Sequence, residues 1–389
     1  MSLSNITLSA AVRQNLLSLQ GTADLLATTQ GRLATGKKVN SALDNPTNFF
    51  TAAGLDARAS DISNLLDSIG NGVQVLQAAN TGITSLSKLV DTAKSIANQV
   101  LQQPSGYTAK STVTSAAALG GTAANLVDGV TIKSGQTIIV AANGSLPALT
   151  VTIGASESLD QLNTALAAGN LTASLDSANK LVITTTNDYA SSTIGAVTVG
   201  STPGTATFGA AVAPVADAVS QATRASLVSQ YNQILTQITT TAQDASFNGI
   251  NLLNGDTLKL VFDETGKSTS TITGVTFSPA GLGLAALASG TDFLDNFSTN
   301  SVLTKLNTAS TTLRSQASAF GANLSIVQIR QDFNKNIINV LQTGSSALTL
   351  ADSNEEAANS QALSTRQSIA TSALSLANQS QQSVLQLLR

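Results

Sequence analysis

The feature that most constrains this chain is an unbroken heptad repeat of apolar residues between positions 62 and 100. Its members follow a 3-4 spacing, the 3.5-residue period of a coiled coil. At 1.5 Å per residue, a helix from Asp56 to Leu101 would be about 70 Å long, too long for a compact domain. The repeat therefore predicts a helical rod that ends at the breaker cluster 103–106. Its positions are Ile62, Leu65, Ile69, Gly72, Leu76, Ala79, Ile83, Leu86, Val90, Ala93, Ala97 and Val100.

Both ends of the chain carry a further helical repeat. The first ends near Gly36, and Asp44-Asn45-Pro46 then provides an N-cap and a proline for the next helix. Two inner helical patterns, at 227–238 and 302–320, also match each other. This symmetry favours a chain that runs out along a rod and returns along it. The terminal seams are Val12, Leu16, Leu19, Ala23, Leu26, Gln30 and Leu33, and Leu363, Gln367, Ala370, Leu374, Ala377, Gln381, Val384 and Leu388.

The central segment has a different composition, rich in Thr, Val, Gly and Ala, with short alternating apolar runs that are typical of strands. Two more such runs, flanking Asp263-Glu264-Thr265-Gly266, predict a β-hairpin. Within the central segment, strands are expected at 130–132, 138–140, 149–153, 171–175 and 181–183, and a short helix at 158–168.

The expected fold is mainly α, a long antiparallel coiled-coil rod built from both chain ends. Residues 1–44 and 345–389 are expected to form paired terminal helices. Residues 45–105 and 218–344 form the helical rod domain, with the hairpin near 256–278. Residues 106–217 form a β-rich (α+β) insert exposed at the surface.

Composition excludes most chemistry. With neither His nor Cys, the chain has no Ser-His-Asp triad, no Cys-His pair and no ordinary zinc site, so we expect no enzyme, cofactor or metal. The 19 basic residues are scattered among 22 acidic ones, which argues against nucleic-acid binding. No run approaches the roughly 18 apolar residues of a membrane span, so no membrane insertion is expected. The N-terminus also lacks the cationic region of a cleaved signal peptide.

The terminal seams point to assembly. An isolated helix over residues 12–33 would bury about five large apolar side chains, too few to offset the ordering of some 25 residues. We therefore expect the ends to be largely disordered in a monomer and to fold against neighbouring copies. A simple bundle core remains the alternative, but the C-terminal helix has no charge between Arg366 and Arg389, unlike a solvent-facing helix.

Three segments resemble one family, bacterial flagellin, in an alphaproteobacterial-like variant. Leu33–Asn45 is similar to the family's LSTGKRINSAKDD segment, 246–255 to its FNGxNLLNG segment, and 374–389 to its C-terminus. The likeness covers roughly 1–105 and 218–389. Its motif residues are Gly36, Asn40, Ser41, Asp44, Phe247, Asn248, Gly249, Leu252, Leu253 and Gly255.

The resemblance implies a subunit that polymerises with itself into the extracellular flagellar filament. The terminal helices would line the central channel, and the insert would project into solvent. Export would proceed without a cleaved signal through a type III apparatus. The implied partners are an export chaperone, a filament cap and hook-junction proteins. Two alternatives stay open: a hook–filament junction protein of the same design, and a filament subunit whose insert acts as an adhesin.

Many flagellins carry a QRxREL stretch that an animal innate immune receptor reads. The corresponding residues here are Ser87-Lys88-Leu89-Val90-Asp91-Thr92, which keep one basic residue. The resemblance therefore implies a degenerate receptor segment, with Ser87, Lys88, Val90 and Asp91 in place of the usual residues.

Overall fold

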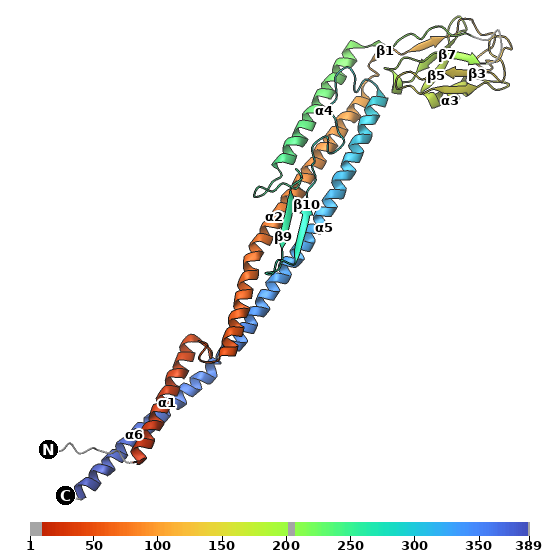
Figure 1. Ribbon diagram of the computed structural model, residues 1–389. Helices are drawn as coiled ribbons and strands as arrows, with labels where there is room; N and C mark the ends of the chain where they lie inside the picture. The colour runs from red at the N-terminus through yellow and green to blue at the C-terminus, as the bar shows by residue number, and fades with distance from the viewer. Residues whose placement is uncertain (1–9, 201–206, 388–389) are drawn as a thin grey trace. The chain divides into compact units, whose positions relative to one another are not determined.

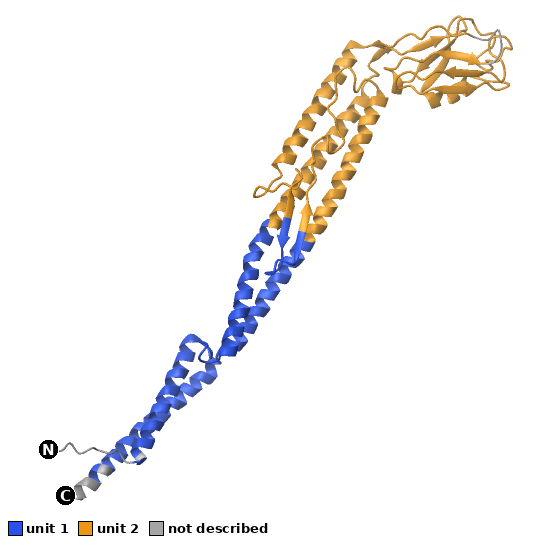
Figure 2. Cartoon of the chain, in the orientation of Figure 1, with its two compact units in different colours: residues 1–71, 259–270, 326–389 blue, residues 72–258, 271–325 orange. Residues whose placement is uncertain are grey.

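The computed structural model describes residues 10–200 and 207–387, and 57% of the chain is helical. Figure 1 labels its elements, which fall into two compact units. Unit 1 comprises residues 1–71, 259–270 and 326–389, and unit 2 comprises 72–258 and 271–325 (Figure 2). The helices are α1 (Ala10–Thr35), α2 (Pro46–Gln102), α3 (Leu159–Leu166), α4 (Ala218–Asp244), α5 (Asn296–Thr349) and α6 (Ser353–Leu387).

The heptad repeat is part of the 57-residue helix α2, as expected, but the helix begins ten residues before Asp56. The start lies where the sequence places it: Asn45 Oδ1 accepts a hydrogen bond from Asn48 N at 3.0 Å, and Pro46 is the first helical residue. The helix ends just before Pro104.

The helical part of unit 2 contains the second half of α2, all of α4 and the first half of α5. Each segment buries one stripe of side chains at 3-4 spacing. The predicted heptad seam of α2 and the stripes of α4 and α5 form the helical core of this unit. On α2 the stripe includes Leu76, Ile83, Leu86, Val90 and Val100; on α4 Leu227, Tyr231, Leu235 and Ile238; on α5 Val302, Leu306, Leu313 and Phe320.

The insert, also in unit 2, contains two three-stranded antiparallel sheets with α3 beside them, and a two-stranded sheet, β1 with β8, at its ends. One three-stranded sheet has the order β2-β6-β5 and the other β4-β3-β7, and their inward residues share one apolar core. Ser158 and Gln161 form a capping box at the start of α3. The strands are β1 (Tyr107–Ala109), β2 (Thr112–Thr114), β3 (Thr137–Val140), β4 (Leu149–Thr152), β5 (Leu171–Leu175), β6 (Leu181–Thr185), β7 (Val197–Gly200) and β8 (Val215–Ala216), with 3-10 turns at Ala167–Gly169 and Asn187–Tyr189.

The expected strand at 130–132 is wrong. The side chain of Asp128 accepts hydrogen bonds from the backbone amides of Val130, Thr131 and Ile132, so this segment is a tight loop instead. These contacts hold the pKa of the Asp128 carboxyl well below its ordinary value, although burial acts against them. In a strand, the backbone amides of residues 130–132 would bond to a neighbouring strand. Here they bond to the Asp128 carboxylate, which comes just before this apolar segment.

The insert is fastened to the start of α5 within unit 2. The Ser191 hydroxyl donates to Asp295, which also accepts from Ser298 N at 2.9 Å in the first turn of the helix. The rings of Tyr189 and Phe297 stack with their centroids 4.5 Å apart. The insert therefore packs directly on a helix terminus, in addition to its two covalent connections.

The predicted β-hairpin is present as β9 (Thr257–Val261) and β10 (Thr269–Thr273). In unit 1 its tip contacts both long helices. The Nε of Arg58 on α2 donates to Glu264 Oε1 at 2.6 Å, and Asn334 Nδ2 on α5 donates to the Phe262 carbonyl at 3.0 Å. The hairpin tip thus joins the unit 1 segments of α2 and α5.

The turn before the hairpin needs a glycine on α2. A Cβ on Gly82 would lie 2.5 Å from Leu253 Cδ1 and 2.6 Å from Ala245 Cβ. We expect Gly82→Ala to lower the free energy of unfolding by about 1–3 kcal/mol through overpacking, despite the better helix propensity of alanine.

Urea unfolding followed by circular dichroism measures this loss. Gly321→Ala on α5 is the matched control, because nothing lies within 4 Å of the added Cβ and the gain in helix propensity should stabilise the chain. Equal effects of the two substitutions would contradict the close packing at Gly82.

Candidate assembly surface

Exposed apolar side chains are concentrated in unit 1. Of the nineteen exposed large hydrophobic residues among those described, thirteen belong to unit 1, although it is the smaller unit. This distribution makes the helices of unit 1 the candidate surface for contact with other proteins. The helical ones are Leu16, Leu17, Leu25 and Leu33 on α1, Phe50 on α2, Ile326, Ile329, Phe333 and Val340 on α5, and Ile369 and Leu376 on α6.

The terminal helices α1 and α6 pack against each other, but they bury little. Val12 is buried, whereas Leu16 and Leu33 are 37% and 42% exposed. On α1, the buried positions are shifted by one residue from the predicted seam, so Thr22 and Thr29 are buried in place of Ala23 and Gln30. Leu19, Leu26, Leu363 and Leu374 are half-buried; the side chain of Val384 and the whole of Leu388 lie outside the described residues.

The helical state of both ends differs from the expected disorder in a monomer. That expectation treated each helix as isolated, and the pairing of α1 with α6 supplies the missing partner. An ion pair adds to it: Arg32 Nη1 lies 3.2 Å from Glu356 Oε1, while Glu356 Oε2 is buried without a hydrogen-bond partner. Few large apolar side chains are buried where α1 and α6 pack, and several of their leucines stay exposed.

The first motif forms the connection between α1 and α2. Gly36 has a φ of +68°, which ends α1 in the left-handed region, and its carbonyl accepts from Ala351 N at 3.0 Å. Asp44 Oδ2 accepts from the amides of Ser41 and Asn40, which lowers the pKa of its carboxyl below the ordinary value. Since Lys38 N also donates to Thr349 O at 2.7 Å, this turn lies beside the α5–α6 turn.

The second motif is a structural element of unit 2. Asn248 and Gly249, with φ of +50° and +80°, form a two-residue turn between Phe247 and Ile250. Asn251 Nδ2 then donates to the carbonyls of Ala242 and Gln243 at the end of α4. Leu252 and Leu253 are fully buried, and Gly255 has a φ of +90°. The motif ends α4 and returns the chain to the core.

The receptor segment lies on α2. Lys88 and Asp91 are exposed, and Asp91 is 3.7 Å from Lys94, whereas Val90 is fully buried and Ser87 half-buried. The exposed face of the 87–92 segment therefore carries one cation, Lys88, and one carboxylate, Asp91, which pairs with Lys94.

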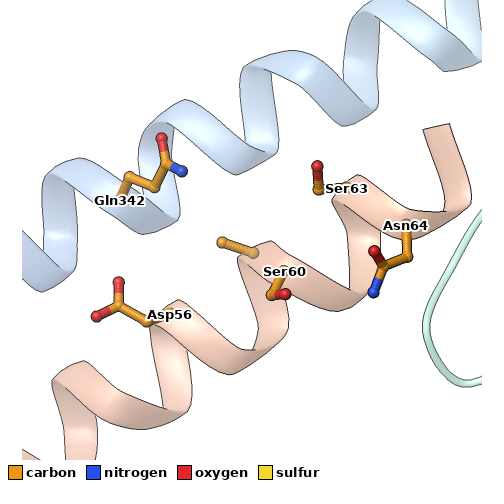
Figure 3. Close-up of a pocket in the computed structure, with 6 residues that line it drawn as sticks. Asp56, Ser60, Ser63, Asn64 and Gln342 are labelled. Carbon is orange, nitrogen blue, oxygen red and sulfur yellow. The ribbon is translucent and has the colours of Figure 1, made fainter. Parts of the chain in front are cut away.

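One groove in unit 1 is lined mainly by polar side chains. This groove, shown in Figure 3, is lined by Asp56, Ala59, Ser60, Ser63 and Asn64 of α2 and by Gln342 of α5. A groove lined by polar side chains offers hydrogen bonds to another chain.

Among the described residues there is no group of three acidic, His or Cys side chains that could hold a metal ion, and no helix there is long and apolar enough to cross a membrane.

Comparisons with known proteins agree at both ends. Residues 5–118 match the family model for the bacterial flagellin N-terminal helical region, and residues 303–388 match that for the C-terminal helical region. Together these segments make up just over half of the 389 residues.

Similar proteins include three flagellins of Caulobacter vibrioides, FljM, FljK and FljO, which are 32%, 30% and 29% identical over 164 residues. The aligned part is 42% of this chain, and it spans 59% of each relative. With family matches at both ends, and with both motifs placed in the fold as described, the chain belongs to the bacterial flagellin family.

Proposed function

We propose that this chain is the structural subunit of a bacterial flagellar filament, in which copies polymerise for swimming motility. The observation that carries the proposal is the concentration of exposed apolar side chains on the helices of unit 1, formed by the chain ends that match the family. Burial of such side chains between copies stabilises a polymer. The subunit is structural and carries out no catalysis.

The proposal includes the surroundings of the polymer. The filament lies outside the cell, and the chain reaches it by type III export without a cleaved signal peptide. An export chaperone, a cap and hook-junction proteins are the partners, and residues 106–217 face solvent on the filament surface.

Electron microscopy of the purified chain after addition of short filament seeds tests the function. We expect filaments that lengthen with added protein. A hook–filament junction protein would bind the seeds without extending them, and that result would overturn the proposal.

We expect weak activation of the innate immune receptor by the 87–92 segment, because Lys88 is its one cation and the segment also carries the carboxylate Asp91. A cell-reporter assay with monomeric protein measures this. Activation as strong as that by a flagellin with the QRxREL stretch would contradict the expectation.

A further inference from the structure

Within unit 2, the insert is attached to the helices at a third place, besides its two chain connections. The two connections pair as the short ribbon of β1 and β8, which by itself would act as a hinge. The third attachment joins the segment 187–191 of the insert to residues 295–297 at the start of α5. An attachment outside the hinge limits rotation about it.

Asp295 is shared between the helix and the insert. Its Oδ1 accepts a hydrogen bond from the Ser298 amide at 2.9 Å and caps α5, while Ser298 Oγ accepts from the Asp295 amide at 3.3 Å. The other oxygen, Oδ2, accepts from the Ser191 hydroxyl and, at 3.4 Å, from the Ser191 amide. Since Asp295 is only 3% exposed, moving Ser191 away would leave a buried carboxylate oxygen without these donors, which is costly.

An aromatic contact lies next to this carboxylate. Tyr189 is one of the buried residues of the insert's apolar core, and its ring stacks on Phe297 of α5, with the ring planes at 27°. Between the two contacts, Asn296 Nδ2 donates to Asp188 Oδ1 at 2.9 Å. Three consecutive residues of α5 thus each contact the insert.

The 187–191 segment is itself held firmly by the rest of the insert. Lys110 Nζ donates to Asn187 Oδ1 at 3.0 Å, and the amide of Ile194 donates to Ser111 Oγ at 3.0 Å. Ser111 is fully buried, and its hydroxyl donates in turn to the carbonyl of Val212 at 2.7 Å. The contact with α5 therefore fixes the body of the insert as well as this segment.

We infer that these contacts form a lock that holds the insert in one orientation on the helical part of unit 2. The lock consists of Tyr189 and Ser191 on the insert and Asp295 and Phe297 on α5. Domains joined by short connections move relative to each other by default, unless the contact between them prevents it. The lock is a property of the single chain, so its test does not depend on assembly.

Two spin labels measure the orientation of the insert. The chain has no native Cys, so Ser174→Cys on β5 and Lys305→Cys on α5, both at exposed positions, provide one attachment site each. Double electron–electron resonance on the full chain then gives the distribution of distances between the labels. We expect a single narrow distribution. A broad distribution in this chain would overturn the lock, whatever the variants below show.

Opening the lock is the second test. Ser191→Ala with Phe297→Ala removes one partner from each contact and leaves the Asp295 cap of α5 in place. In the labelled chain we expect unchanged helix content by circular dichroism and a distribution at least about twofold broader. If the double variant loses helix, Ser191→Ala alone allows the same comparison.

The matched control is Ser192→Ala with Val219→Ala, which changes the neighbouring serine and an exposed residue of α4 outside the lock. Its distribution should stay as narrow as that of the unmodified chain. A lock variant that keeps the narrow distribution, or a control that broadens equally, would refute the inference. Either result would leave the proposed filament function untouched, since that is tested by seeded growth.

Discussion

Deletion of residues 353–389 is expected to abolish filament growth while the rest of the chain stays folded. The deletion removes α6, whose described contacts are mainly with α1, and exposes the face of α1 that includes Val12 and Thr29. The cores of unit 2 and of the insert contain no residue of α6. Circular dichroism and seeded growth, measured together, separate the two effects.

The matched control removes the insert. Tyr107 pairs with Ala216, and Gly106 O accepts from Asp217 N at 2.9 Å, so the two ends of the insert are adjacent and a short glycine linker can replace 107–216. We expect this variant to form filaments, because an insert that acts as surface decoration or as an adhesin is not needed for assembly. Filaments from the α6 deletion would contradict assembly through the terminal helices, and failure of the insert deletion would make the insert architectural.

Arg224→Ala is expected to have the largest effect on stability. Arg224 is 1% exposed, and its guanidinium donates to the carbonyls of Pro104 and Phe293 at 2.9 and 2.8 Å. Burial lowers the pKa of this group, with Asp295 acting in the opposite direction. Removing the side chain leaves two carbonyls without their donor and opens a cavity, so we expect a loss of about 3–5 kcal/mol.

Urea unfolding measures this loss, and two further variants identify its cause. Arg224→Met keeps most of the volume without the donors, so its smaller loss isolates the hydrogen bonds. Arg314→Ala, at an exposed position of α5, should change stability by less than about 0.5 kcal/mol. A loss below about 1 kcal/mol for Arg224→Ala would contradict the role of Arg224 in joining α4 to the 104 and 293 turns.

Long periodic elements could be predicted from the sequence because their pattern repeats many times. The seam through Leu76 and Val90, the helix start at Asn45-Pro46 and the hairpin at 257–273 are all confirmed. The first turn-rich part of the insert could not be predicted, since the side chain of Asp128 binds amides that local propensity assigns to a strand. Local patterns do not reveal such a competing partner.

The packing of the terminal helices differs in register from the predicted seams. Leucines mark both predicted seams in the sequence, but the inward face of α1 buries Thr22 and Thr29. The buried Arg224 gives no signal at all, since its carbonyl partners lie about 70 and 120 residues away in the chain.

Hydrogen exchange of monomer and filament tests the central claim most directly, that the terminal helices are weakly held alone and secured by neighbouring copies. In the monomer, amides of residues 10–35 and 353–380 should exchange fast, while those of α2 at 76–100 exchange slowly. In the filament all three should exchange slowly. Terminal amides that are already protected in the monomer, or that stay unprotected in the filament, would contradict the account.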